Sequence, residues 1–274
     1  MKNKVGVIQG RLVPKYQGRY QAFPIGYWED EFHVASDCGL DLIEFILDYN
    51  DASENPLLIE GGIDKIKSVI HKTEVSVQSI CADYFMEAPL HSKDKVKNEE
   101  SRKILIKLIS NASELGVRDI VIPCVDQSSL VDIEDEGRFV KNLLPIVEIA
   151  ENYGINLSLE TDLAPSQFAE LLDKFNSKRV TVNYDIGNSA SLGFDCNEEL
   201  DAYGHRITDI HIKDRDLGGG PVLLGKGNAD FLKFFNKLKK FDYRGPFIMQ
   251  AYRDDEGIEI FKNQFEWIKH YLNK

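Results

Sequence analysis

The sequence predicts an α/β protein built as one (β/α)8 barrel, the TIM-barrel fold, and three observations lead there. Short runs rich in β-branched residues alternate with longer amphipathic stretches along the 274 residues, which favours parallel strands joined by helices. Eight such strand–helix units can be recognised, the number that closes this barrel. The rival open, doubly wound sheet is disfavoured because IQGRLVPK (8–15) follows the first strand where GxGxxG would stand.

Each predicted strand is a short apolar or β-branched run, and the longer stretches between them carry apolar residues at helical spacing. Two such stretches, 98–115 and 136–153, are followed directly by Gly116 and Gly154, as helices that stop at a left-handed glycine are. No Ser/Gly-rich linker interrupts the chain, so we expect one domain, residues 1–274. The predicted strands are 4–8, 41–46, 75–82, 118–123, 155–160, 179–185, 206–213 and 245–250.

Composition excludes several function classes. The net charge of −12 and the lack of a long basic stretch argue against nucleic acid as a partner. No apolar run is long enough to span a membrane, and MKNKVGVIQGRL at the start lacks the apolar core of a signal peptide. The cysteines are far apart without a CxxC pair, which indicates a reducing compartment, and we expect a cytoplasmic protein. They are Cys38, Cys81, Cys124 and Cys196.

Polar residues stand at the ends of nearly all the predicted strands. In a (β/α)8 barrel the chemistry lies where the strands end, whereas residues at strand starts serve stability. Polar groups are costly to bury without partners, so this pattern indicates a functional site. The residues are Gln9, Arg11, Glu44, Asp83, Asp126, Glu160, Asp162, Asp185, Asn188, His211, Lys213, Arg215, Gln250 and Arg253.

Four of these residues form a candidate metal site on strands five to eight: Glu160, Asp185, His211 and Gln250. Two carboxylates, an imidazole and an amide oxygen suit one divalent ion, Mn²⁺, Mg²⁺, Co²⁺ or Zn²⁺. Simpler explanations exist for each residue alone. Glu160 could pair with a lysine or cap a helix, Asp185 could cap the turn that follows it, and His211 could be a hydrogen-bonded core residue. We favour the metal site because the four coincide at one rim.

The chain resembles the sugar phosphate isomerase/epimerase group of xylose-isomerase-like TIM barrels. The motifs that carry the resemblance are VGVIQGRL, LETDL, NYDIGNSASLG, AYGHRI, HIKDRDLGGG, LGKGNADF and MQAYR. This group includes L-ribulose-5-phosphate 3-epimerases and tagatose 3-epimerases and, more distantly, endonuclease IV. The resemblance implies a divalent ion held by Glu160, Asp185 and His211 that grips neighbouring oxygens of a keto sugar.

The last strand departs from the family pattern. Characterised 3-epimerases place a glutamate where this chain has Gln250. Their two glutamates bind the metal and also move a proton on opposite sides of the substrate carbon. Glutamine can lend a carbonyl oxygen to a metal but cannot take a proton, so the symmetrical two-glutamate epimerisation does not follow for this chain.

These residues predict a metal-dependent isomerase or epimerase acting on a keto sugar or sugar phosphate. Glu160 is the candidate base, and Lys213 could stabilise the enediolate or return the proton. Glu44, Asp83 and Asp162 are reserve acids or bases. The candidate substrate-binding residues are Arg11, Asn188, Arg215 and Arg253.

Two further features and three rival functions complete the prediction. The glycine-rich loop 218–230 could bind phosphate or close as a lid. A homo-oligomer contact or a lid could use a group of early aromatic residues that we expect to be exposed. A dehydratase acting on a cyclic polyol or keto acid needs only one strong base, a non-catalytic sugar-binding barrel needs none, and an endonuclease IV-like phosphodiesterase is disfavoured by the few histidines. The aromatic residues are Tyr16, Tyr20, Phe23, Tyr27 and Trp28.

Overall fold

The computed structural model describes residues 3–255 and 257–272, so the ends of the predicted domain 1–274 and position 256 lie outside the described residues. Eight parallel strands close into a barrel in the order β1-β10-β7-β6-β5-β4-β3-β2, and the fold class predicted from sequence is confirmed. Every predicted strand is present. They are β1 (Val5–Ile8), β2 (Leu42–Ile46), β3 (Ser79–Cys81), β4 (Asp119–Cys124), β5 (Asn156–Thr161), β6 (Val180–Asp185), β7 (Ile207–Ile212) and β10 (Phe247–Met249).

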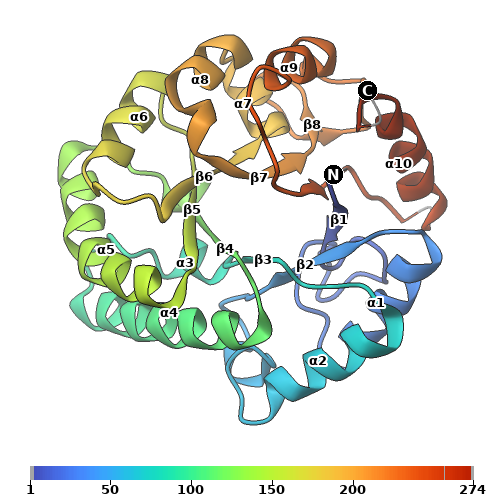
Figure 1. Ribbon diagram of the computed structural model, residues 1–274, viewed down its shortest axis with the longest axis horizontal. Coiled ribbons are helices and arrows are strands. Elements are labelled where there is room, and N and C mark those ends of the chain that lie inside the picture. The colour runs from blue at the N-terminus through green and yellow to red at the C-terminus, as the bar shows by residue number, and fades with distance from the viewer. Residues whose placement is uncertain (1–2, 256, 273–274) are drawn as a thin grey trace.

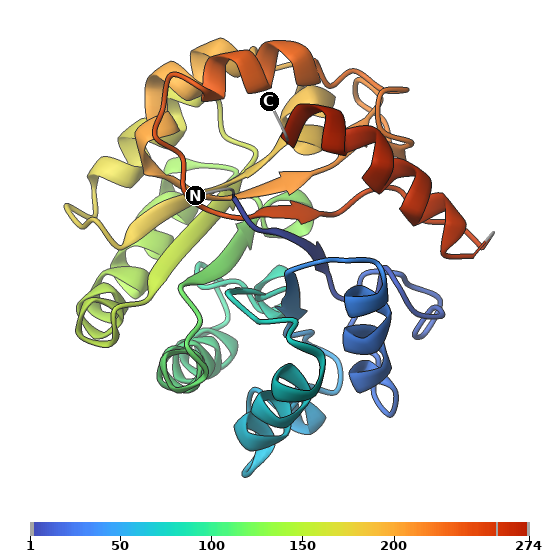
Figure 2. The same cartoon turned by 45° about the vertical axis from the view of Figure 1, so that its right-hand side comes forward.

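Helices form a ring around the barrel (Figure 1), and the tilted view shows the strands running through its centre (Figure 2). The two predicted helices are confirmed, but each begins three residues earlier than expected, at Lys95 and Ile133. The reason is capping, because the Asp94 and Asp132 side chains accept the free amides of the first turns. The helices are α1 (Trp28–Asp37), α2 (Gly62–Thr73), α3 (Tyr84–Glu87), α4 (Lys95–Leu115), α5 (Ile133–Tyr153), α6 (Pro165–Asp173), α7 (Ile186–Leu192), α8 (Cys196–Tyr203), α9 (Phe231–Leu238) and α10 (Glu259–Leu272).

The early aromatic residues do not form the exposed group predicted from the sequence. Phe23 and Trp28 are only 4% and 8% exposed, and both pack against Phe45 of β2 with ring centroids 5.6 Å apart. Only the three tyrosines of the group retain partial exposure. The prediction is wrong for Phe23 and Trp28 because the two rings pack against each other and against Phe45 in the core.

The glycine-rich loop is organised by one buried carboxylate. Asp214 lies in β8 (Asp214–Arg215), which pairs with β9 (Pro221–Val222) in a short antiparallel hairpin. Its oxygens accept the backbone amides of Gly225 at 2.9 Å, Gly227 at 2.9 Å and Ala229 at 3.0 Å. The N–H groups of these three residues are therefore not free to bind a phosphate. Within the described ranges, no helix is both long and apolar enough to cross a membrane.

Candidate functional site

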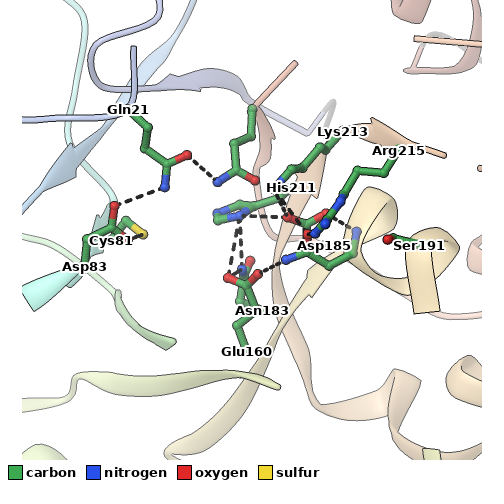
Figure 3. A network of polar contacts seen from close by, with 12 residues as sticks. Gln21, Cys81, Asp83, Glu160, Asn183, Asp185, Ser191, His211, Lys213 and Arg215 are labelled. Atoms are coloured by element: carbon green, nitrogen blue, oxygen red, sulfur yellow. Dashed lines mark hydrogen bonds and ion pairs between the residues drawn. The ribbon is translucent and has the colours of Figure 1, made fainter. Parts of the chain in front are cut away.

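A carboxylate–imidazole cluster lies at the C-terminal mouth of the barrel, where Glu160, Asp185 and His211 meet (Figure 3). Asp185 and His211 are direct neighbours in the pairing of β6 with β7, and Glu160 comes from β5 beside them. The Nδ1 atom of His211 lies 4.0 Å from one oxygen of each carboxylate. One ligand atom from each residue lies within 4.8 Å of the other two, a spacing that could hold a divalent ion.

The other ring nitrogen of His211, Nε2, is held by Glu44 of β2. His211 Nε2 lies 2.9 Å from Glu44 Oε1, and the second Glu44 oxygen accepts a hydrogen bond from Ser79 Oγ at 2.6 Å. A carboxylate behind a histidine sets its tautomer and orientation, and here it leaves Nδ1 facing the cluster. Glu44, predicted as a reserve acid or base, thus orients the imidazole of His211.

The charges around His211 control its protonation. Burial lowers the pKa of His211, but the neighbouring carboxylates, Glu44 first among them, outweigh burial and raise it to about 10. Burial raises the pKa of Glu44, and the attraction of His211 overcomes that effect and holds it below its usual value. A protonated His211 must lose a proton before its Nδ1 can bind a metal, so metal binding should depend on pH.

Asp209 is a buried carboxyl that the sequence interpretation missed. It lies in β7, is fully buried, and neither of its oxygens has a hydrogen-bond partner among the described residues. Burial and the nearby charge of Glu44 raise its pKa well above the usual value. Asp209, Glu44 and His211 form a second group at metal-ligand spacing, but Nε2 is already engaged by Glu44. The alternation of DIH in a strand places Asp209 on the same face as His211, a signal that could have revealed it.

Glu160 is surrounded by amide donors. Asn183 Nδ2 donates to one oxygen at 3.1 Å and Asn188 Nδ2 to the other at 2.6 Å. Burial, followed by the charge of Asp185, raises the pKa of Glu160 to about 7. A carboxylate with this pKa is well matched to taking and releasing a proton near neutral pH.

The two oxygens of Asp185 have different roles. Its Oδ1 accepts the backbone amide of Asn188 at 2.8 Å and so caps α7, which is the simpler explanation considered from sequence. Its Oδ2 faces His211 and lies 3.3 Å from Lys213 Nζ. Capping therefore orients the carboxylate toward the cluster and does not compete with a role in metal binding.

Gln250 supplies an unpaired oxygen. Its backbone amide donates to Ile212 and its side chain, 4% exposed, follows β10, the strand that pairs with β7. Its Nε2 donates to Gln21 Oε1 at 2.9 Å, whereas its Oε1 is buried and has no partner among the described residues. A buried carbonyl oxygen without a partner is costly, by about 1–3 kcal/mol. The donor set of two carboxylates, one imidazole nitrogen and this amide oxygen fits a divalent ion.

Lys213 and Arg215 converge on Asn188. Lys213 Nζ lies 3.2 Å and Arg215 Nη1 2.8 Å from Asn188 Oδ1, and the same asparagine donates to Glu160. Gly187 allows this approach, since a Cβ there would lie 2.7 Å from Lys213 Cγ. The structure thus brings three of the predicted site residues together around Glu160.

The two other predicted arginines lie across the mouth. Arg11 Nη2 donates to Gln21 at 3.2 Å, and burial lowers its pKa to about 10. Arg253 stacks over Tyr20, 4.6 Å from the ring centroid, and its Nε donates to the backbone carbonyl of Arg11 at 2.9 Å. Arg253 therefore holds the segment that carries Arg11, and Arg11 is the one of the pair that reaches the mouth's polar network.

The largest cavities do not coincide with this cluster. One of about 550 Å³ is lined by Thr181 and Arg206, and one of about 470 Å³ is lined by Asp119 and His205. A smaller cavity of about 230 Å³ opens at the C-terminal mouth beside Gln21 and Asp83. We assign the functional site to the C-terminal mouth because the side chains that could bind a metal gather there. The volume of a cavity does not by itself indicate a catalytic site.

Curated proteins match this chain over most of its length. SgbU of Escherichia coli (strain K12) is 29% identical over 263 residues, covering 88% of this chain and 90% of SgbU. L-ribulose-5-phosphate 3-epimerase UlaE of Escherichia coli O1:K1 / APEC is 27% identical over 267 residues, covering 93% of both chains.

Solved structures show the same fold at low identity. The apo form of 3-keto-D-glucoside 4-epimerase YcjR from E. coli superimposes with a TM-score of 0.77 at 16% identity, covering 98% of this chain and 100% of YcjR. L-ribulose 3-epimerase gives 0.75 at 18% identity, covering 99% and 95%. The family model described as xylose isomerase-like TIM barrel matches residues 32–271. The chain therefore belongs to the xylose isomerase-like TIM barrel family.

Proposed function

We propose that this protein is a divalent-metal-dependent isomerase or epimerase of a keto sugar or sugar phosphate. The observation that carries the proposal is the buried cluster of Glu160, Asp185 and His211 with the unpaired Gln250 oxygen at the same mouth. The name of UlaE supports a phosphorylated pentulose as the first substrate to test.

Glu160 is the proposed proton-transfer residue. Its raised pKa, about 7, makes it a base that can also release the proton, and Asn183 and Asn188 hold the two oxygens in place. Asp185, His211 and Gln250 would complete the metal's ligands. A divalent ion bound there would polarise the substrate carbonyl and stabilise the negative charge that develops on its oxygen.

Lys213 and Arg215 are the proposed cationic contacts to substrate. Lys213 lies between Asp185 and Asn188, so its ammonium faces the same space as the Glu160 carboxylate. It can donate a hydrogen bond to a substrate oxygen or return a proton. Arg215, fixed by Asn188 and by the Gly219 carbonyl at 3.0 Å, presents its remaining donors at the rim.

A dehydratase is the second candidate, and Gln250 favours it. An amide cannot accept a proton, so of the two residues flanking the substrate carbon in relatives only Glu160 is a base here. Dehydration starts with the same proton abstraction and requires one strong base. Product analysis after the exchange experiment below distinguishes an epimer from a dehydrated ketone.

The test combines metal analysis with isotope exchange. We expect about one divalent ion per chain, lost in His211→Ala and Glu160→Ala, and exchange of a substrate C–H with solvent deuterium for a ketose or its phosphate. Glu160→Gln should lower the exchange rate by about 10²–10⁴-fold. Glu199→Gln is the matched control, because Glu199 is a buried glutamate like Glu160 but accepts hydroxyl groups from Tyr184 and Tyr203 outside the cluster. A wild-type protein without metal or without exchange on all ketoses would refute the proposal.

A further inference from the structure

A line of side-chain hydrogen bonds crosses the C-terminal mouth and ends at Gln250. Gln250 Nε2 donates to Gln21 Oε1 at 2.9 Å. Gln21 Nε2 in turn donates to Asp83 Oδ2 at 3.0 Å, the bond drawn between these two residues in Figure 3. Gln21 comes from the segment between β1 and α1, and Asp83 follows β3. Neither residue belongs to the cluster of Glu160, Asp185 and His211, and the proposed proton transfer uses neither.

Arg11 and Asp83 fix the orientation of the Gln21 amide, and through it that of the Gln250 amide. Arg11 Nη2 also points at Gln21 Oε1, at 3.2 Å, and a guanidinium can only donate. Asp83 accepts from Gln21 with one oxygen and from Cys81 Sγ with the other, at 3.1 Å. These two hydrogen bonds oppose the rise in the pKa of Asp83 that burial causes. Turning the Gln21 amide over would set its NH₂ against Arg11 and its oxygen against the Asp83 carboxylate.

The orientation of Gln21 is passed on to Gln250. Because Gln21 offers its oxygen, Gln250 must offer its NH₂ group, and its own oxygen is left turned away from Gln21. That oxygen is the buried Oε1 without a partner. Asp83 and Arg11 thus determine that the side-chain oxygen of Gln250, and not its NH₂ group, remains available to a cation.

The segment that carries Gln21 is held firmly. Glu31, fully buried in α1, accepts the backbone amides of Gly10 at 2.8 Å and Leu12 at 2.9 Å. Asp48 accepts the backbone amide of Phe23 at 2.8 Å, two residues after Gln21. The segment is therefore anchored on both sides of Gln21, as a residue that orients another requires.

We propose that Gln21 is a positioning residue that, fixed by Arg11 and Asp83, presents the Gln250 carbonyl oxygen as a neutral ligand to the divalent ion. This inference rests on the proposed function for the identity of the ion. It explains how a glutamine serves on the last strand: a glutamate there would set a carboxylate oxygen against Gln21 Oε1. With two carboxylates and two neutral ligands, the charges of a divalent ion are balanced within the site.

The test measures Mn²⁺ affinity directly, by the electron paramagnetic resonance signal of the free ion, and needs no substrate. Residues that orient a ligand contribute about 10–100-fold to metal affinity. We expect Gln21→Met to weaken Mn²⁺ binding by that amount, Gln250→Met by at least as much, and the double variant no more than Gln250→Met alone. Gln127→Met is the matched control, since Gln127 is an exposed glutamine of the same mouth that donates to Glu87.

Each outcome separates the inference from the proposed function. If wild type binds no Mn²⁺, or His211→Ala binds as well as wild type, the proposed function fails and the inference fails with it. If wild type binds and His211→Ala does not, but Gln21→Met stays within twofold of wild type, only the inference is overturned. It is also overturned if Gln21→Met weakens binding as much in the Gln250→Met background as alone. Thermal unfolding of the metal-free variants checks that the mouth remains folded, and Gln21→Asn serves as a second variant if Gln21→Met is unstable.

Discussion

Metal binding should expel a proton from His211, and replacing Glu44 should reduce that release by more than half. In the metal-free protein Glu44 is the strongest of the charges that raise the pKa of His211 to about 10. At about pH 8 the imidazole is then almost fully protonated, so a metal arriving at Nδ1 displaces close to one proton. The apparent affinity should rise about tenfold per pH unit between about pH 7.5 and 9. Below about pH 7 the dependence should steepen, because Glu160, with a pKa of about 7, also binds a proton there.

Glu44→Gln is the informative perturbation because it removes the charge and keeps the shape. A glutamine can still accept from His211 Nε2 and can donate to Ser79, the second partner of Glu44. The pKa of His211 should fall below the assay pH, since burial, which lowers it, is then opposed by fewer charges. We expect the number of protons released at about pH 8 to fall from about one to well under half of one.

Calorimetry in buffers of different ionisation enthalpy measures this number directly. Glu199→Gln is the matched control, because Glu199 is also buried and accepts hydroxyl groups, from Tyr184, Ser189 and Tyr203, but lies outside the contacts of His211. It should release as many protons as wild type. Equal proton release in wild type and Glu44→Gln, or none in wild type, would refute the electrostatic account of His211.

Two further predictions concern the glycine loop and the approach of Lys213. Asp214→Asn should lower the free energy of unfolding by about 1–3 kcal/mol, because the side-chain amide of asparagine cannot accept hydrogen bonds from all three backbone N–H groups. The variant should also expose loop 218–230 to limited proteolysis. Cleavage at the wild-type rate would contradict this role of Asp214. Gly187→Ala should cost about 1–3 kcal/mol, measured by urea unfolding, since its Cβ would collide with Lys213. Gly137→Ala in α5, where a Cβ meets nothing within 4 Å, should instead stabilise by about 0.5–1 kcal/mol, and equal effects at both glycines would rule out the collision.

The sequence predicted the barrel well because its signals are local. Strand runs such as 155–160 and helical spacing such as 136–153 are readable within one element, and a capping aspartate refines each boundary afterwards. Glu160, Asp185 and His211 could be grouped because parallel strands of a barrel end at one mouth. The early aromatic residues were misjudged because burial of Phe23 and Trp28 depends on contact with Phe45 of β2, which lies about 20 residues away in the sequence.

The partners of the site residues, in contrast, come from positions far apart in the chain. Glu44 and His211 are 167 residues apart, and Gln21 and Gln250 are 229 residues apart. No local pattern links such pairs, and only closure of the barrel, with β10 beside β1, brings them into contact. The sequence by itself thus determined the fold and that Glu160, Asp185 and His211 end at one mouth. The tertiary structure alone decided which of them orient the others, because hydrogen-bond direction and charge act between side chains that meet only when the barrel closes.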